Sequence, residues 1–269
     1  MIAASCHLPG INVQNLSRVI LQLHRAGREM SFSQFQPSAL ELVQEMIPFD
    51  SAWWGNAAAE PMEIHRVYLF NCDDTILETY TPYMQQDFFR AALMAQPGIT
   101  INMADLTTRA RYVRTALYRE VGKRYRVEWS LGTLLVEPIS SLYEFLTLWR
   151  HEPKRPFSEA ERQTKELLMP HLVEAGRASR LREVLDGTHA RPGHWAVADE
   201  RGYLRETSPG FIHCLRTHWP DWRGSRLPQA MLANVQTATP FNAGRMKFQM
   251  ACKGMFRYVQ VSTFNALDR

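Results

Sequence analysis

The stretch FSEAER, Phe157 to Arg162, is the strongest folding signal in the chain, because it marks where a long helix begins. Ser158 takes the N-cap position and Glu161 follows three residues later, so each side chain can satisfy the other residue's backbone N–H. Apolar side chains then recur on one stripe, made of Leu168, Leu172, Ala175, Ala178, Leu181 and Leu185. Pro170 removes a backbone hydrogen bond and should bend the first turns. The stripe can pack on its own domain or on a second copy of the chain, and we expect a homodimer.

The segments before this helix predict an antiparallel sheet with helices packed against it. Apolar residues recur at helical spacing from Ile11 to Met30, and a second helical run covers Ser38 to Met46. The stretches PFDSAWWGN and EIHRVYLF then have the composition of two partner strands. VEWSLGTLLVEP and SLYEFLTLWRH predict a second hairpin, rich in β-branched and aromatic residues. The sequence therefore predicts an α+β domain over residues 11–185.

A turn-rich linker, DGTHARPG, separates the long helix from a second α+β domain that we place at residues 194–265. HWAVADERGYLRETS predicts two strands around a turn, and GFIHCLRTHW and QAMLANVQTA predict short helices. MKFQMACKG and MFRYVQVSTF predict a final hairpin. This order of elements resembles a small PAS-like sensor module, and other α+β domains share it.

The composition indicates a folded protein, and the overall charge does not point to a particular kind of partner. Hydrophobic residues make up 45% of the 269 residues, enough to build a core for each of two domains. The formal net charge of +4 is small for this length, so the molecule as a whole is not expected to bind polyanions. The cysteines form no close pair, and neither a signal peptide nor an apolar run of about 18 residues is present. We therefore expect a reduced, cytoplasmic protein with no membrane partner.

The adjacent tryptophans of PFDSAWWGN predict a ligand pocket on the sheet. Successive side chains of a strand point to opposite faces, so Trp53 and Trp54 cannot both serve one core. We expect one sheet face to be free of helices and lined by aromatic rings with a few polar tips, as small-molecule pockets are. The candidate ligand-binding residues are Trp53, Trp54, Tyr68, Tyr83, Phe88, Trp129 and Tyr143. The alternative is an aromatic core without a vacancy, and the strand register decides which tryptophan faces the ligand.

A run of basic residues interleaved with tyrosines lies between positions 109 and 126. The basic residues are Arg109, Arg111, Arg114, Arg119, Lys123, Arg124 and Arg126, and the tyrosines are Tyr112, Tyr118 and Tyr125. Such a run could bind nucleic acid, or a small-molecule carboxylate that a guanidinium holds with two hydrogen bonds. Because the run has no compact helix-turn-helix pattern, a solvated helix face is the simpler interpretation.

No spacing of residues in the sequence requires catalysis. A nucleophile needs a histidine within reach, held by a third group, and a hydrolase built on Cys72 or Cys214 is the enzyme alternative. His213, Cys214 and His218 resemble a set of metal ligands, but histidines five positions apart lie on different faces of a helix. We therefore expect no catalytic residue, no metal and no cofactor.

Several framework segments together resemble the sensor region of LuxR-type transcriptional regulators that carry a GAF-like domain ahead of a C-terminal helix-turn-helix. The likeness rests on FDSAWWG, YTPYMQQDFF, LTLWRHEPKRPFSEAERQTKELLMPHLVEAGRASRL, ADERGYLRETSPGF and WRGSRLP, which cover most of Phe49 to Pro228. None of these segments is an active-site motif. The resemblance implies a GAF-like antiparallel sheet flanked by helices, joined by the long helix to the PAS-like domain.

The same resemblance implies a regulatory function. In LuxR-type regulators a DNA-binding domain begins soon after a segment like NALDR, and this chain stops at Arg269. We therefore expect the ligand-sensing, dimerising region of such a regulator, which reaches DNA only through a helix-turn-helix outside this chain. The alternative is a free-standing modulator that heterodimerises with a full-length regulator. An acyl-homoserine lactone is not implied, because Tyr83 and Asp87 have the spacing of lactone-binding members but Phe88 stands where their proline is expected.

Overall fold

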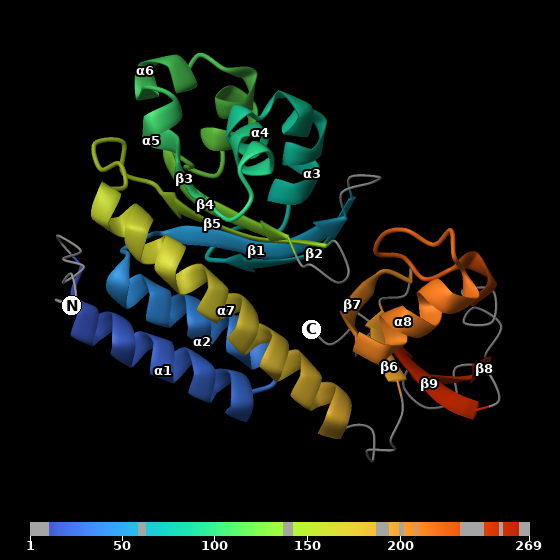
Figure 1. The fold of residues 1–269 in the computed structure, drawn as a ribbon. Coiled ribbons are helices and arrows are strands. Elements are labelled where there is room, and N and C mark those ends of the chain that lie inside the picture. Colours follow the sequence, from blue (N-terminus) through green and yellow to red (C-terminus); the bar gives the residue numbers. More distant parts are fainter. Residues whose placement is uncertain are drawn as a thin grey trace, which may run out of the picture. The chain divides into compact units, whose positions relative to one another are not determined.

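The computed structural model divides the chain into two compact units, each with its own sheet (Figure 1). The first unit consists of Met1–Asn56, Ile64–Val136 and Glu144–Ser179, and the second of Ala57–Glu63, Glu137–Tyr143 and Arg180–Arg269. The structure describes residues 11–58, 63–136, 142–186, 194–198, 202–207, 209–231, 245–252 and 255–263. The domain limits 11–185 and 194–265 stay predictions, and the linker at 187–193 lies outside the described residues.

Two helices open the first unit, as the apolar periodicity predicts. Helix α1 covers Val13–Glu29 and begins at Asn12, whose side chain accepts a hydrogen bond from the backbone of Asn15. Helix α2 covers Phe32–Met46 and continues through Pro37, so it begins a turn and a half earlier than its prediction. The prediction started only after this proline, but the capping box of Ser31 and Gln34 already starts the helix ahead of it.

A five-stranded antiparallel sheet forms the centre of the first unit and confirms the predicted α+β class. Its strands are β1 (Ser51–Ala58), β2 (Glu63–Phe70), β3 (Thr100–Asn102), β4 (Trp129–Val136) and β5 (Tyr143–Arg150). The order is β2-β1-β5-β4-β3, so both predicted strand pairs are neighbours and β5 lies in the middle. Strand β3 adds to the edge in antiparallel register with β4, with Ile101 opposite Gly132.

Helices cover both faces of this sheet, so the expectation of a helix-free face is wrong. Figure 1 shows α1, α2 and α7 on one face and the short helices of the middle segment on the other. The short helices are α3 (Ile76–Tyr80), η1 (Thr81–Gln86), α4 (Phe88–Ala95), α5 (Met103–Leu106), α6 (Arg109–Tyr112) and η2 (Tyr118–Gly122). Each is too short to give a clear apolar period, which is why the sequence reads as irregular there.

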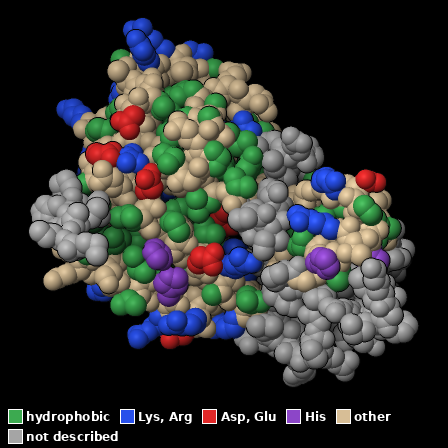
Figure 2. Space-filling model, in the orientation of Figure 1, with side chains coloured by type: hydrophobic (Ala, Val, Ile, Leu, Met, Phe, Trp, Pro, Cys, Tyr) green, Lys and Arg blue, Asp and Glu red, His purple; other side chains and the backbone are tan. Residues whose placement is uncertain are grey.

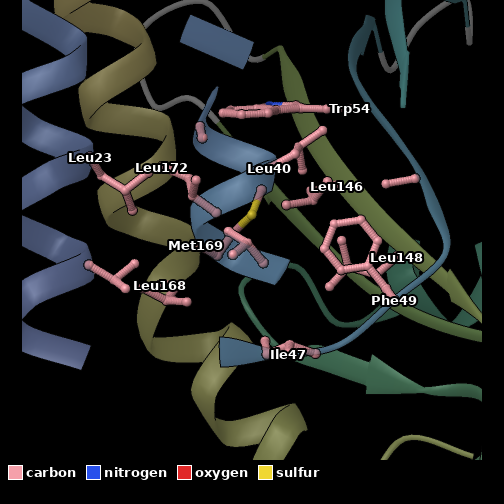
Figure 3. Close-up of a cluster of buried hydrophobic side chains, with 14 of the residues drawn as sticks. Leu23, Leu40, Ile47, Phe49, Trp54, Leu146, Leu148, Leu168, Met169 and Leu172 are labelled. Carbon is pink, nitrogen blue, oxygen red and sulfur yellow. The ribbon is translucent and has the colours of Figure 1, made fainter. Parts of the chain in front are cut away.

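Helix α7 covers Glu159–Asp186 and begins at the predicted capping box. The backbone N–H of Ser158 donates to Glu161 Oε2 at 2.8 Å, and the N–H of Glu161 donates to Ser158 Oγ at 3.3 Å. Leu168, Leu172 and Ala175 are fully buried, and Figure 3 shows Leu168 and Leu172 within the core of their own unit. This part of the stripe therefore packs on its own domain, which is the first of the two alternatives for the stripe. Homodimerisation itself stays a prediction.

Arg150 ties the start of α7 to the end of the sheet. Its guanidinium donates to the carbonyl oxygens of Pro48 and Pro156 and to the carboxylate of Glu161, and its side chain is 3% exposed. Desolvation alone would raise the pKa of Glu161, but the hydrogen bonds from Arg150 and Ser158 outweigh it and lower that pKa. Glu161 thus caps the helix and neutralises a buried arginine at once.

The second unit has a four-stranded sheet of order β7-β6-β9-β8. Its elements are β6 (His194–Ala198), β7 (Leu204–Thr207), α8 (Pro209–His218), β8 (Arg245–Cys252) and β9 (Met255–Thr263). Strand β6 pairs with β9 in parallel, whereas β8 and β9 form the predicted hairpin. Phe211 and Leu215 of α8 pack in its core with Leu204. Most of the predicted helix QAMLANVQTA lies outside the described residues, and the PAS-like assignment stays a prediction.

Candidate ligand-binding site

The two adjacent tryptophans of β1 lie on opposite faces of the sheet, as strand alternation predicts. Trp54 is fully buried on the face covered by α1, α2 and α7, where its ring meets Phe35 at a centroid distance of 5.9 Å (Figure 3). Its indole N–H donates to Glu144 Oε1 at 3.0 Å. We call this side of the sheet the Trp54 face. Here an indole fills a core and has its polar atom satisfied.

Trp53 lies on the other side, which we call the Trp53 face, within a cluster of aromatic rings. Its ring centroid lies 5.2 Å from that of Tyr80, 5.7 Å from Phe145 and 5.1 Å from Trp149. Tyr83 packs against the same cluster. We call these five residues the aromatic cluster. Two of its members, Phe145 and Trp149, come from β5, and Tyr80 and Tyr83 come from the short helices above the sheet.

The indole nitrogen of Trp53 differs from that of Trp54 in its hydrogen bonding. Trp53 Nε1 is buried and has no hydrogen-bond partner in the structure. Leaving a buried donor unsatisfied costs about 1–3 kcal/mol, so native proteins rarely keep one without a reason. An acceptor supplied by an ordered water or by a bound molecule would remove this cost.

The buried carboxyl group of Asp87 lies beside Tyr80 on the Trp53 face. The hydroxyl of Tyr80 donates to Asp87 Oδ2 at 2.8 Å, while Asp87 Oδ1 accepts from the backbone N–H groups of Phe89 and Arg90 and so caps α4. Desolvation raises the pKa of Asp87 despite these hydrogen bonds, and it also raises the pKa of Tyr80. Asp87 thus pairs with Tyr80, and not with Tyr83, whose spacing to Asp87 resembles that of lactone-binding members.

The structure divides the predicted ligand-binding residues between the two faces. Trp53 and Tyr83 belong to the aromatic cluster, and Tyr143 precedes Phe145 by two positions on β5. The ring of Phe88 meets that of Tyr112 edge to face, with ring centroids 6.2 Å apart. The remaining candidates, Trp54, Tyr68 and Trp129, pack in the core of the Trp54 face.

The indole N–H of Trp129 has a hydrogen-bond partner within the core, like that of Trp54. Trp129 Nε1 donates to the carbonyl oxygen of Pro153 at 3.0 Å, so this indole is satisfied within the fold. Sequence reasoning assigned Trp54, Tyr68 and Trp129 to a helix-free face, and the long helices occupy that face instead. It missed Tyr80, Phe145 and Trp149, although the alternation of β5 places Phe145 and Trp149 on one side of the strand.

The basic run is divided between one internal ion pair and an exposed surface. Arg109 Nε lies 2.8 Å from Glu128 Oε2, and the hydroxyl of Tyr118 donates to the other oxygen of the same carboxylate. The other basic side chains of the run are exposed, namely Arg111, Arg114, Arg119, Lys123, Arg124 and Arg126. Anion binding by this surface stays a prediction.

The cysteines of the enzyme alternative lack the features of a nucleophile. Desolvation and the nearby Asp73 raise the pKa of Cys72 to about 11, so its thiol is protonated at neutral pH. Cys214 is buried, and Nδ1 of the neighbouring His218 lies 2.9 Å from the carbonyl oxygen of Cys214.

Within the described part of the chain, no three His, Cys, Asp or Glu side chains converge as a metal site. No helix there is long and apolar enough to cross a membrane.

Solved structures with a similar fold are found among sensor domains of transcriptional regulators. Escherichia coli SdiA matches at 13% identity and a TM-score of 0.50, over 85% of this chain and 85% of SdiA. SdiA in complex with octanoyl-rac-glycerol matches at 14% identity and a TM-score of 0.50, over 85% of this chain and 84% of that one. The N-acylhomoserine lactone dependent LuxR family transcription factor CepR2 from Burkholderia cenocepacia matches at 12% identity and a TM-score of 0.48, over 65% of this chain and 100% of CepR2.

No protein-family model and no curated protein sequence matches the chain. At the identities of the structural matches, the likeness concerns the fold alone. On that level the predicted resemblance is confirmed, and the chain has the fold of the ligand-binding domains of LuxR-type regulators.

Proposed function

We propose that this chain is the ligand-sensing region of a LuxR-type transcriptional regulator and that the aromatic cluster around Trp53 binds the ligand. The observation that carries the proposal is the buried, unpartnered indole N–H of Trp53, set among four other aromatic rings. A site of apolar walls with a single oriented donor is the usual construction of a small-molecule pocket. The fold shared with SdiA supports the proposal.

The chemistry of the cluster favours a neutral ligand with an apolar body and an oxygen acceptor. The indole N–H can only donate, so it requires an acceptor such as an ester or amide carbonyl. An anionic ligand would be brought beside the buried carboxyl of Asp87, which is unfavourable at low dielectric. Octanoyl glycerol, the molecule in one SdiA complex, is of the neutral class.

Ligand binding would act on the regulator by ordering the short helices of the Trp53 face. Tyr80 and Tyr83 belong to α3 and η1, so a molecule that contacts them changes the stability of these segments relative to the long-helix layer. A ligand shifts a conformational equilibrium only by its differential affinity for the two states. The output in this proposal is DNA binding by a cytoplasmic homodimer, through a helix-turn-helix outside the chain.

The experiment compares two conservative tryptophan variants in the presence of 1-octanoyl-rac-glycerol. Trp53→Phe keeps an aromatic ring but removes the unpartnered donor, whereas Trp54→Phe removes a donor that Glu144 already satisfies. We expect the probe to raise the melting temperature of the parent and to change its tryptophan emission. Trp53→Phe should weaken binding about tenfold, the equivalent of one hydrogen bond of about 1.4 kcal/mol.

The Trp54→Phe control should lose stability without losing the response to the probe. A parent that responds neither to octanoyl glycerol nor to a panel of neutral acyl esters and amides would contradict the proposal. Equal weakening of binding in both variants would also contradict it, because the Trp54 indole lies on the opposite face of the sheet.

A further inference from the structure

Two histidines meet where α1 packs on α7, far from the aromatic cluster in both sequence and sheet face. His24 Nε2 lies 3.2 Å from His171 Nδ1, and the two rings meet at an interplanar angle of 86° with centroids 5.4 Å apart. Both side chains are half-buried, and Figure 2 shows histidines side by side on the surface over these helices. One nitrogen from each ring is thus aimed at the other, at the edge of the solvent.

We propose that His24 and His171 form a two-histidine site for a divalent transition-metal cation of the Zn²⁺, Ni²⁺ or Cu²⁺ class. A tetrahedral ion bound to two imidazole nitrogens at about 2.0–2.1 Å holds them about 3.3 Å apart. The observed separation of 3.2 Å matches this spacing, but each ring must turn so that its lone pair points at the ion instead of at the other ring. These metals bind well to imidazole nitrogen, whereas Mg²⁺ and Ca²⁺ prefer oxygen ligands.

The packing around the pair holds its two helices at a fixed spacing. One turn further along, Gly27 lies so close to α7 that a Cβ atom there would collide with the carbonyl oxygen of Ala175. Beyond it, the hydroxyl of Ser179 donates to the carbonyl oxygen of Met30 at 2.8 Å. Neither helix can slide past the other without breaking these contacts, so the two nitrogens are presented together before any metal arrives.

The two histidines are the protein ligands in this proposal. No third His, Cys, Asp or Glu joins the pair among the residues that the structure describes. The two histidines therefore supply two positions, and water fills the others. A bound ion would link α1 to α7 and stabilise the long-helix layer in proportion to the logarithm of its concentration.

The test uses the full chain without an affinity tag and follows the binding of Ni²⁺ and Zn²⁺ by calorimetry. We expect one saturable site and a rise in melting temperature that EDTA reverses. His24→Ala and His171→Ala should each weaken binding at least about tenfold. His151→Ala is the matched control, because His151 is also half-buried but pairs with Ser51, and it should bind metal like the parent.

Two further readouts separate a metal site from a simple N–H···N hydrogen bond between the rings. With Cu²⁺, the electron paramagnetic resonance spectrum should show two nitrogen ligands in the parent and fewer in either variant. In EDTA, both variants should melt close to the parent, which confirms that they fold. Metal binding that is unchanged in His24→Ala and His171→Ala, or the absence of saturable binding to the parent, would overturn the proposal.

Discussion

The two faces of the first sheet contrast in how their buried polar groups are satisfied. On the Trp54 face, the indole of Trp54 donates to Glu144, the amino group of Lys165 donates to Thr133 Oγ1 and Leu146 O, and Arg150 donates to two carbonyls and a carboxylate. On the Trp53 face, the equivalent indole N–H has no partner. Two neighbouring residues of one strand therefore differ in whether the fold satisfies their indole N–H.

The difference lies in what covers each face. Long helices α1, α2 and α7 seal the Trp54 face with fully buried side chains such as Leu40, Leu168 and Leu172. Short helices cover the Trp53 face, and two members of the aromatic cluster, Trp53 and Tyr83, are only partly buried. Short helical segments held by few contacts are the elements that open and reorder most easily. In the proposed function, the satisfied face supplies stability and the unsatisfied face binds the ligand.

The largest effect should come from truncating each tryptophan in turn. Trp54→Ala removes a fully buried ring from a packed core and should lower the free energy of unfolding by about 3–5 kcal/mol. Trp53→Ala should cost less, about 1–2 kcal/mol, because the ring is partly exposed and its loss also removes an unsatisfied donor. Urea denaturation of both variants measures the difference. Equal losses of stability would mean that the two faces are equally well packed, which would contradict the proposed difference between them.

A second prediction concerns the buried lysine of the Trp54 face. Lys165 is fully buried, and desolvation lowers its pKa well below the usual range, while Glu166 only partly compensates. The unfolded chain keeps a lysine pKa of about 10.4, so below that pH it binds a proton that the folded state does not. Stability should therefore fall as the pH falls from about 10.4 towards the folded pKa, by at most about 1.4 kcal/mol per pH unit.

Lys165→Met should remove this pH dependence, because methionine fills a similar volume and does not titrate. Denaturation curves of parent and variant between neutral pH and about pH 10 test it, since the slope lies in the window set by the lowered pKa. Thr133 keeps a hydrogen bond from or to Thr100 in the variant, so no buried hydroxyl is orphaned. A parent with no slope in this window would mean that Lys165 stays protonated in the folded state.

Local signals predicted the framework of this fold well. The capping box at Ser158, the first helix and the strand pairs all follow from short-range chemistry, which a sequence displays directly. The opposite orientation of Trp53 and Trp54 follows from strand alternation in the same way. These features need no knowledge of what lies across the sheet.

The identity of each face could not be predicted, because it depends on segments distant in sequence. Trp54 faces the core only because α2 and α7 pack on its side, and Tyr80 reaches the cluster from a short helix without a clear apolar period. The contacts of Arg150 with Pro48, Pro156 and Glu161, and that of His24 with His171, also arise from tertiary structure. Sequence reasoning therefore located the aromatic residues but expected Trp54, Tyr68 and Trp129 on a helix-free face, whereas long helices cover them.

The smallest effect should come from the helix cap that starts α7. Ser158→Ala removes the hydroxyl that accepts from the backbone N–H of Glu161 and should cost about 1 kcal/mol, the usual value for an N-cap. The loss stays small because Glu161 still accepts from the backbone N–H of residue 158 and still binds Arg150. Ser17→Ala, at an exposed position within α1, is the matched control and should leave stability unchanged or slightly higher, since alanine favours helices.

This variant also sharpens the contrast between the faces, because the cap belongs to the layer on the Trp54 face. Thermal melts of Ser158→Ala with and without octanoyl glycerol should show a lower melting temperature and an unchanged ligand-induced shift. A cap variant that loses the shift together with its stability would show that the Trp53 face depends on the long-helix layer for binding. In that case stability and sensing would not be divided between the two faces of the sheet, and the partly open side would be only the weaker part of a single cooperative core.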